Sequence, residues 1–180
     1  MKGKFQISAG AVLLLTALYY LGGLGSLAAL ITAALVHEAG HIAALIASGV
    51  TVEGFRFSAS GICMSVGSFK SPGNEILCLA SGPLAGLVYA FAVRDLYPPS
   101  AQYSLLLTVF NILPVSVLDG GRILNCVLGD ILGMKNTGKI SDALGMTVAV
   151  SLTLAGLMLL HRELGAAVFC AGIYLLIAEC

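Results

Sequence analysis

The sequence is poor in charge of either sign and has no long polar stretch. Only 10% of its 180 residues are Asp, Glu, Lys or Arg, the net charge is zero, and 58% of the residues are hydrophobic. A soluble domain carries about 25% charged residues, so this composition excludes an ordinary soluble enzyme or binding domain. Because there is no basic run, nothing indicates a nucleic-acid partner. The sequence predicts an integral membrane protein in contact with the lipid bilayer.

Paired cysteines and internal repeats are also lacking. The five cysteines are scattered, form no C-x-x-C pair and are odd in number, which argues against a disulfide framework. The absence of repeated halves is unlike many transporters, which are built from duplicated halves. The chain is therefore expected to form one domain over residues 1–180.

Long apolar runs are what the sequence has in abundance. A membrane helix needs about 20 residues, so the length allows about six spans with short connections. Glycines at 22, 23 and 25 should separate the first two spans, and Gly49 should end the second. The first apolar run resembles a signal peptide but has no convincing cleavage site, so a retained span is expected. The spans are expected at about 5–21, 26–48, 74–93, 101–113, 140–160 and 164–178, with a short helix at about 121–132.

One segment has the period of a strand. From Thr51 to Lys70 the chain is mixed polar and apolar, and apolar residues alternate with small or polar ones over residues 62–67. Ser60-Gly61 could form the turn of a hairpin. The predicted fold is an all-α polytopic membrane protein with a small β-hairpin or sheet at the membrane surface after the second span. The alternative for this segment is a plain surface connector.

The second apolar span contains H-E-x-x-H, formed by His37, Glu38 and His41. Residues four apart share one face of a helix, so the two histidines can bind one metal ion. Glu38 could then take a proton from a metal-bound water. Hydrogen bonding between helices is the alternative use of these side chains. Three ionisable residues are costly in an apolar span, which favours the metal site.

Two histidines leave a catalytic zinc ion one protein ligand short. Asp119 ends an apolar run and is followed by two glycines, whereas Glu53 and Glu75 lie beside expected surface turns. Taken alone, Asp119 could instead cap the helix that follows it. Together with the histidine pair, Asp119 is the preferred third ligand.

These residues resemble the site-2 protease family of intramembrane zinc metalloproteases. The resemblance covers about residues 26–130 and rests on two motifs in the expected order, with a Gly-Pro pair between them. The segments are His37-Glu38-x-x-His41, Gly82-Pro83 and Asn111-x-x-Pro114-x-x-x-Leu118-Asp119-Gly120-Gly121-Arg122. No inserted PDZ domain fits, and no regulatory domain is expected after the sixth span. The chain looks like the minimal-core branch, similar to the sporulation-factor processing proteases.

The resemblance implies an activity and a set of roles. His37, His41 and Asp119 would bind one Zn²⁺ per chain, Glu38 would be the general base, and Asn111 would hydrogen-bond the substrate carbonyl or oxyanion. The substrate would be a membrane-associated protein cut in or near a transmembrane segment, and a regulatory membrane partner is compatible with this activity. Many members have Asn where this chain has Gly86, so a substrate contact at that position is not expected here.

Two other functions are compatible with an intramembrane histidine pair. A catalytically silent membrane binding or chaperone protein would not need Glu38. A zinc transporter would need ligands along a transit path. Cleavage of a reconstituted substrate by the wild type and by Glu38→Gln separates both from a protease.

The distribution of basic residues predicts the orientation. If the six spans alternate and the N-terminus is cytoplasmic, seven Lys and Arg fall on the inner side and two on the outer side. The inner residues are Lys2, Lys4, Arg56, Lys70, Arg122, Lys135 and Lys139, and the outer ones are Arg94 and Arg162. A multi-pass protein of the cell membrane with both termini in the cytoplasm is therefore expected.

Overall fold

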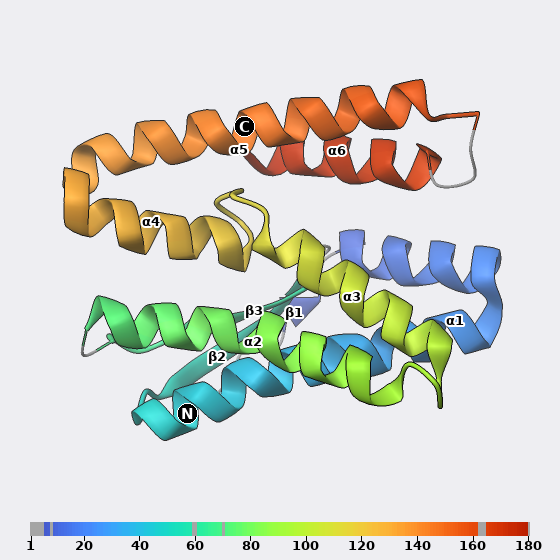
Figure 1. Ribbon diagram of the computed structural model, residues 1–180, viewed down its shortest axis with the longest axis horizontal. Coiled ribbons are helices and arrows are strands. Elements are labelled where there is room, and N and C mark those ends of the chain that lie inside the picture. The colour runs from blue at the N-terminus through green and yellow to red at the C-terminus, as the bar shows by residue number, and fades with distance from the viewer. Residues whose placement is uncertain (1–5, 8, 59–60, 70, 162–164, 180) are drawn as a thin grey trace. The chain divides into compact units, whose positions relative to one another are not determined.

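The computed structural model describes residues 6–7, 9–58, 61–69, 71–161 and 165–179 (Figure 1). This part of the chain forms six helices and three strands, grouped into two compact units, residues 1–110 and 111–180. Three of the helical segments are long and apolar enough to cross a membrane: Gly22–Ser48, Pro72–Val93 and Thr137–Met158. The expected number of six spans and their orientation stay predictions.

The first helix of the first unit contains the break that the glycines predict. The helix α1 runs over Ala9–Ser48, but Gly23 inside it has a non-helical conformation with φ 71°. Positive φ is readily adopted only by glycine, so the chain can change direction there. Gly49, with φ 67°, follows the end of α1, as predicted. The second part of α1 therefore forms a separate helical segment that carries His37 and His41.

A small sheet follows α1. Strand β2 (Val52–Ser58) pairs antiparallel with β3 (Gly61–Val66), and the expected turn residue Ser60 lies outside the described residues. A two-residue strand β1 (Gln6–Ile7) pairs parallel with β2, so the sheet order is β1-β2-β3. The sequence did not predict β1, because its two residues were assigned to the first span.

Two further helices complete the first unit. Helix α2 (Pro72–Val93) packs against α1 and continues through Pro83. Its N-cap is Ser71, whose side-chain Oγ accepts a hydrogen bond from the backbone N–H of Asn74 at 3.3 Å. Pro72 and Gly73 therefore lie within the first turn of the helix, which begins two residues earlier than expected. Helix α3 (Pro98–Ile112) begins three residues earlier than expected and has only 15 residues.

The end of α1 is fixed by a small apolar cluster. Leu45, Val50 and Cys78 are buried together, and Val66 at the end of β3 packs against them. These residues come from α1, the following connection, the sheet and α2. Their burial ties the end of the hairpin to the two helices that carry the histidines and Cys78.

The second unit consists of α4 (Asp119–Leu132), α5 (Met134–Met158) and α6 (Gly165–Glu179). Gly133, with φ 78°, joins α4 to α5. Figure 1 shows α5 and α6 side by side, in orange and red, and α6 is in close contact with α5. Gly156 packs against the backbone of Phe169, and Gly172 packs against Thr153, so these glycines permit the close approach.

Candidate metal centre

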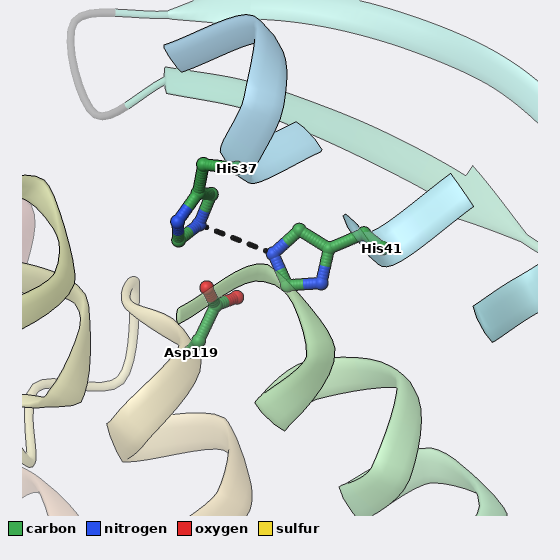
Figure 2. Close-up of side chains that lie close together, drawn as sticks. All are labelled: His37, His41 and Asp119. Carbon is green, nitrogen blue, oxygen red and sulfur yellow. Dashed lines mark hydrogen bonds between the residues drawn. The ribbon is translucent and has the colours of Figure 1, made fainter. Parts of the chain in front are cut away.

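The two histidines of the H-E-x-x-H motif lie together on α1. Both are buried, and their Nε2 atoms are 3.2 Å apart (Figure 2). The rings meet edge to face, with centroids 4.9 Å apart and an interplanar angle of 78°. This geometry follows from the spacing of four residues on a helix. It directs the two ring nitrogens that could bind a metal ion toward the same point.

A carbonyl group of α2 fixes the protonation of one ring. His41 Nδ1 lies 2.7 Å from the Cys78 carbonyl oxygen in a buried hydrogen bond. A carbonyl oxygen only accepts, so Nδ1 carries the hydrogen and, in the neutral ring, Nε2 presents a lone pair. A metal-binding histidine usually donates its other N–H in this way. His41 is therefore oriented as a ligand through Nε2.

The contact between α1 and α2 is close because each helix has a glycine that faces the other helix, Gly40 on α1 and Gly82 on α2. A Cβ on Gly40 would lie 2.5 Å from the Ser81 carbonyl oxygen. A Cβ on Gly82 would lie 2.5 Å from Cε1 of His41 and 2.7 Å from Cδ2, so Gly82 lies directly against the His41 ring. Any side chain at these two positions would push the helices, or the imidazole, apart. The contact of Gly82 with His41 was not predicted from the sequence.

Asp119 is the first residue of helix α4. The N-cap of α4 is Leu118, which makes no side-chain cap hydrogen bond, and Asp119 is the first helical residue. The alternative in which Asp119 is the N-cap was therefore wrong. The connection before it is held by buried Val115 and Leu118 and by a backbone bond of 2.9 Å between them. This anchoring fixes where α4 starts.

The double glycine after Asp119 is needed for the same connection. A Cβ on Gly120 would collide with the Ile112 carbonyl and lie 2.8 Å from the Leu113 carbonyl oxygen. A Cβ on Gly121 would collide with the Val115 carbonyl. The first turn of α4 therefore packs directly on the preceding backbone.

The three expected ligands can serve one metal ion. His37, His41 and Asp119 each offer one ligand atom, and these atoms lie within 4.8 Å of one another (Figure 2). Two imidazole nitrogens and a carboxylate oxygen form a donor set that suits zinc and leaves a position for water or substrate. The chemistry of the donor set and the protonation of His41 thus fit a bound zinc ion.

The remaining candidates are placed as follows. Glu38 is half-buried on α1, directly after His37, and Asn111 is half-buried in the last turn of α3. Glu75 lies in the first turn of α2 and does not join the histidine pair as a metal-binding group among the described residues. Glu53 lies in β2, where side chains are outside the described part of the structure. The roles of Glu38 and Asn111 stay predictions.

Comparison with known proteins agrees with this arrangement. The model of peptidase family M50 matches residues 93–155. A solved structure, the site-2 protease from Methanocaldococcus jannaschii, has the same fold, with a TM-score of 0.78 and 18% sequence identity. The similarity covers 97% of this chain and 88% of that chain. No curated protein sequence matches the chain.

The family match covers the connection before α3, all of α3 and α4, and most of α5, and therefore includes the Asp119 motif. The H-E-x-x-H motif lies outside it, in the part of the chain where the common fold alone applies. The three long apolar helices support a membrane location for the protein, in contact with lipid. Together, these findings show that residues 93–155 match peptidase family M50 and that the chain has the fold of a site-2 protease, and both support an intramembrane metalloprotease.

Proposed function

We propose that this protease uses one Zn²⁺, held by His37, His41 and Asp119, to hydrolyse a peptide bond in or near a transmembrane segment of a membrane-associated protein. The observation that carries the proposal is the histidine pair on α1. Its Nε2 atoms lie 3.2 Å apart, and the Cys78 carbonyl leaves the Nε2 lone pair of His41 available for a metal ion. A zinc ion bound there would polarise the scissile carbonyl and acidify water at its open position.

Each protein group has one task in this proposal. Glu38 follows His37 on the same helix, so its carboxylate is available to accept a proton from the attacking water and to deliver it to the leaving amine. Asn111 lies in the last turn of α3 and would donate its side-chain amide N–H to the oxyanion as charge develops there. Asp119 supplies an anionic ligand from the first turn of α4, where the helix dipole also favours a negative charge.

A peptide bond in a transmembrane helix is protected by its own hydrogen bonds. The substrate segment must therefore unwind locally before its carbonyl can reach the metal, because backbone groups in lipid are satisfied internally. A helix of the substrate that is weakened by Gly or Pro would unwind at lower cost. We expect the cleavage site to lie at such a position. A regulatory membrane partner could act by controlling delivery of this segment.

The orientation in the membrane is part of the proposal. The bias in Lys and Arg supports cytoplasmic N- and C-termini, and it assigns the hairpin β2–β3 and the helix α4 to the cytoplasmic side. The sheet would then lie at the membrane surface, outside the hydrocarbon, because its outer strands have unpaired backbone groups. All 180 residues would form one protease domain.

The test is peptide-bond cleavage by purified protein reconstituted with a candidate transmembrane substrate. We expect Glu38→Gln to abolish cleavage and to retain about one zinc per chain, because glutamine cannot accept the proton but leaves the three ligands in place. His37→Ala should lose zinc and activity together. Turnover by a purified Glu38→Gln protein would contradict the proposed mechanism.

A further inference from the structure

We propose that Thr108 is a positioning residue for His37, whose Nδ1–H it holds through one bridging water molecule that its hydroxyl oxygen binds. The proposal rests on the proposed function, in which Nε2 of His37 binds the metal ion. A neutral imidazole that binds through Nε2 carries its hydrogen on Nδ1, and ligand histidines usually donate this hydrogen to a protein or water oxygen. His41 has the Cys78 carbonyl for this purpose. Thr108 would serve His37 for the same purpose through the bridging water.

Thr108 belongs to a row of buried hydroxyl groups on α3. Ser100, Ser104 and Thr108 are four residues apart, so they share one face of the helix, and each is at most 4% exposed. Their hydroxyls donate to three carbonyl oxygens of α1 and α2. The bonds are Ser100 to Ala29 at 3.1 Å, Ser104 to Gly86 at 2.8 Å and Thr108 to Pro83 at 3.4 Å.

Gly86 creates the space in which Thr108 and His37 come together. A Cβ on Gly86 would lie 2.7 Å from Thr108 Oγ1, 3.3 Å from Ser104 Oγ and 3.8 Å from Nδ1 of His37. The volume that a side chain at position 86 would fill is therefore bordered by two hydroxyl oxygens and by the ring nitrogen of His37. Glycine at this position allows α3 to bring its hydroxyls beside the metal ligand.

The hydrogen-bonding capacity of Thr108 matches the requirement of His37. The single hydrogen of Thr108 is directed to the Pro83 carbonyl, so its oxygen presents lone pairs to other donors. The same holds for Ser104, but its bond to the Gly86 carbonyl is shorter and its oxygen lies farther from the Gly86 position. Thr108 is the nearer and less tightly held acceptor. No direct hydrogen bond joins His37 Nδ1 to Thr108 in the structure, so one water molecule between them would carry the bond from the Nδ1–H to the Thr108 oxygen.

The main test compares Thr108→Val with Thr108→Ser in the full-length protein. Valine keeps the shape of the threonine side chain but removes the hydroxyl oxygen that accepts the hydrogen bond, whereas serine keeps this oxygen. We expect Thr108→Val to weaken zinc binding by about 10–100-fold, as for other partners of ligand histidines, and to shift the ring ¹⁵N signals of His37 in zinc-loaded, ¹⁵N-histidine-labelled protein. Thr108→Ser should remain close to the wild type in both measurements. Zinc affinity is measured by competition with a chelating dye.

A matched control separates positioning from packing. Ser100→Ala removes a hydroxyl from the same face of α3, two turns from Thr108, and it should lower the melting temperature without changing zinc affinity. Gly86→Ala provides a second variant that keeps Thr108, because the new methyl group would displace its oxygen. It should reproduce the zinc affinity of Thr108→Val.

The outcomes distinguish this inference from the proposed function. Wild-type zinc affinity and an unchanged His37 signal in Thr108→Val would refute the role of Thr108 and leave the metal site intact. An equal loss of zinc affinity in Thr108→Val and Ser100→Ala would mean that any hydroxyl removed from this face of α3 disturbs the packing. This outcome would also refute a specific role of Thr108. Retention of full zinc by His37→Ala would instead contradict the proposed function itself.

Discussion

Replacing Gly82 with alanine tests the metal centre without touching a ligand. In the structure the new Cβ would collide with Nε2 of His41 and lie 2.5 Å from Cε1, whereas ordinary contacts begin near 3.4 Å, so the ring must retreat by at least about 0.9 Å. Zinc–ligand distances in a functional site hold to within about 0.2 Å. A displacement of this size removes His41 from the ligand set or moves the whole helix α1.

Helix propensity alone predicts that Gly82→Ala would do no harm and would stabilise the protein. Alanine in a helix interior is favoured over glycine by about 1 kcal/mol, so without the imidazole the substitution would stabilise α2. Because His41 occupies the space, we expect zinc affinity to fall by at least about 100-fold, the upper end of what loss of an outer partner costs. Activity should fall with it.

The assay is zinc titration of the purified apoprotein, with thermal unfolding measured in parallel. Gly138→Ala is the matched control, because its Cβ would meet no atom within 4 Å and it lies in another helix, α5. This control should keep wild-type zinc affinity and equal or higher stability. A Gly82→Ala protein with wild-type zinc affinity would refute the contact between Gly82 and the His41 ring.

Three further predictions follow from other parts of the chain. Asp119→Asn and Asp119→Ser should lose zinc and cleavage, because Asp119 is not the N-cap of α4 and a capping side chain cannot replace it; full zinc and activity in both would exclude Asp119 as a ligand. Gly120→Ala should destabilise the protein by about 1–3 kcal/mol in thermal unfolding, because its Cβ would collide with the Ile112 carbonyl; an unchanged melting temperature would contradict this. In single-cysteine versions, a membrane-impermeant thiol reagent outside intact cells should not label Cys63 or Cys180, and strong labelling would reverse the proposed orientation.

Local patterns in the sequence were sufficient for the elements of the site. The spacing of His37 and His41 fixes their shared face, and Gly49 ends α1 because positive φ is readily adopted there. Partners from other helices could not be read in this way. The acceptor for His41 is the backbone carbonyl of Cys78, which leaves no trace in the side chain at that position. Strand β1 was missed because two residues give no period, and its pairing with β2 depends on the fold of the chain.

Glycines were the least predictable site residues. Gly82 and Gly86 have the spacing of a general helix-packing face, and only the structure distinguishes their neighbours. Gly82 lies against His41, whereas Gly86 lies between hydroxyls of α3 and His37. A sequence pattern of small residues indicates close approach of helices but does not indicate which side chain makes the approach.

The hydroxyl row of α3 has a consequence for the biogenesis of the protein. With 15 residues, α3 is shorter than the roughly 20 that cross a bilayer, and alone it would expose Ser100, Ser104 and Thr108 to lipid. Helix α2 precedes it by only four residues and supplies Tyr89 Oη, 3.0 Å from Ser100 Oγ, and two carbonyl acceptors. If α3 enters the bilayer together with α2 as one helical hairpin, as the predicted six spans require, these hydroxyls have partners from the start. During synthesis, stable integration of α3 would therefore wait for its pairing with α2. The packing of α3 against α2, which brings Thr108 beside Gly86 and His37, would then occur in the same step as membrane insertion.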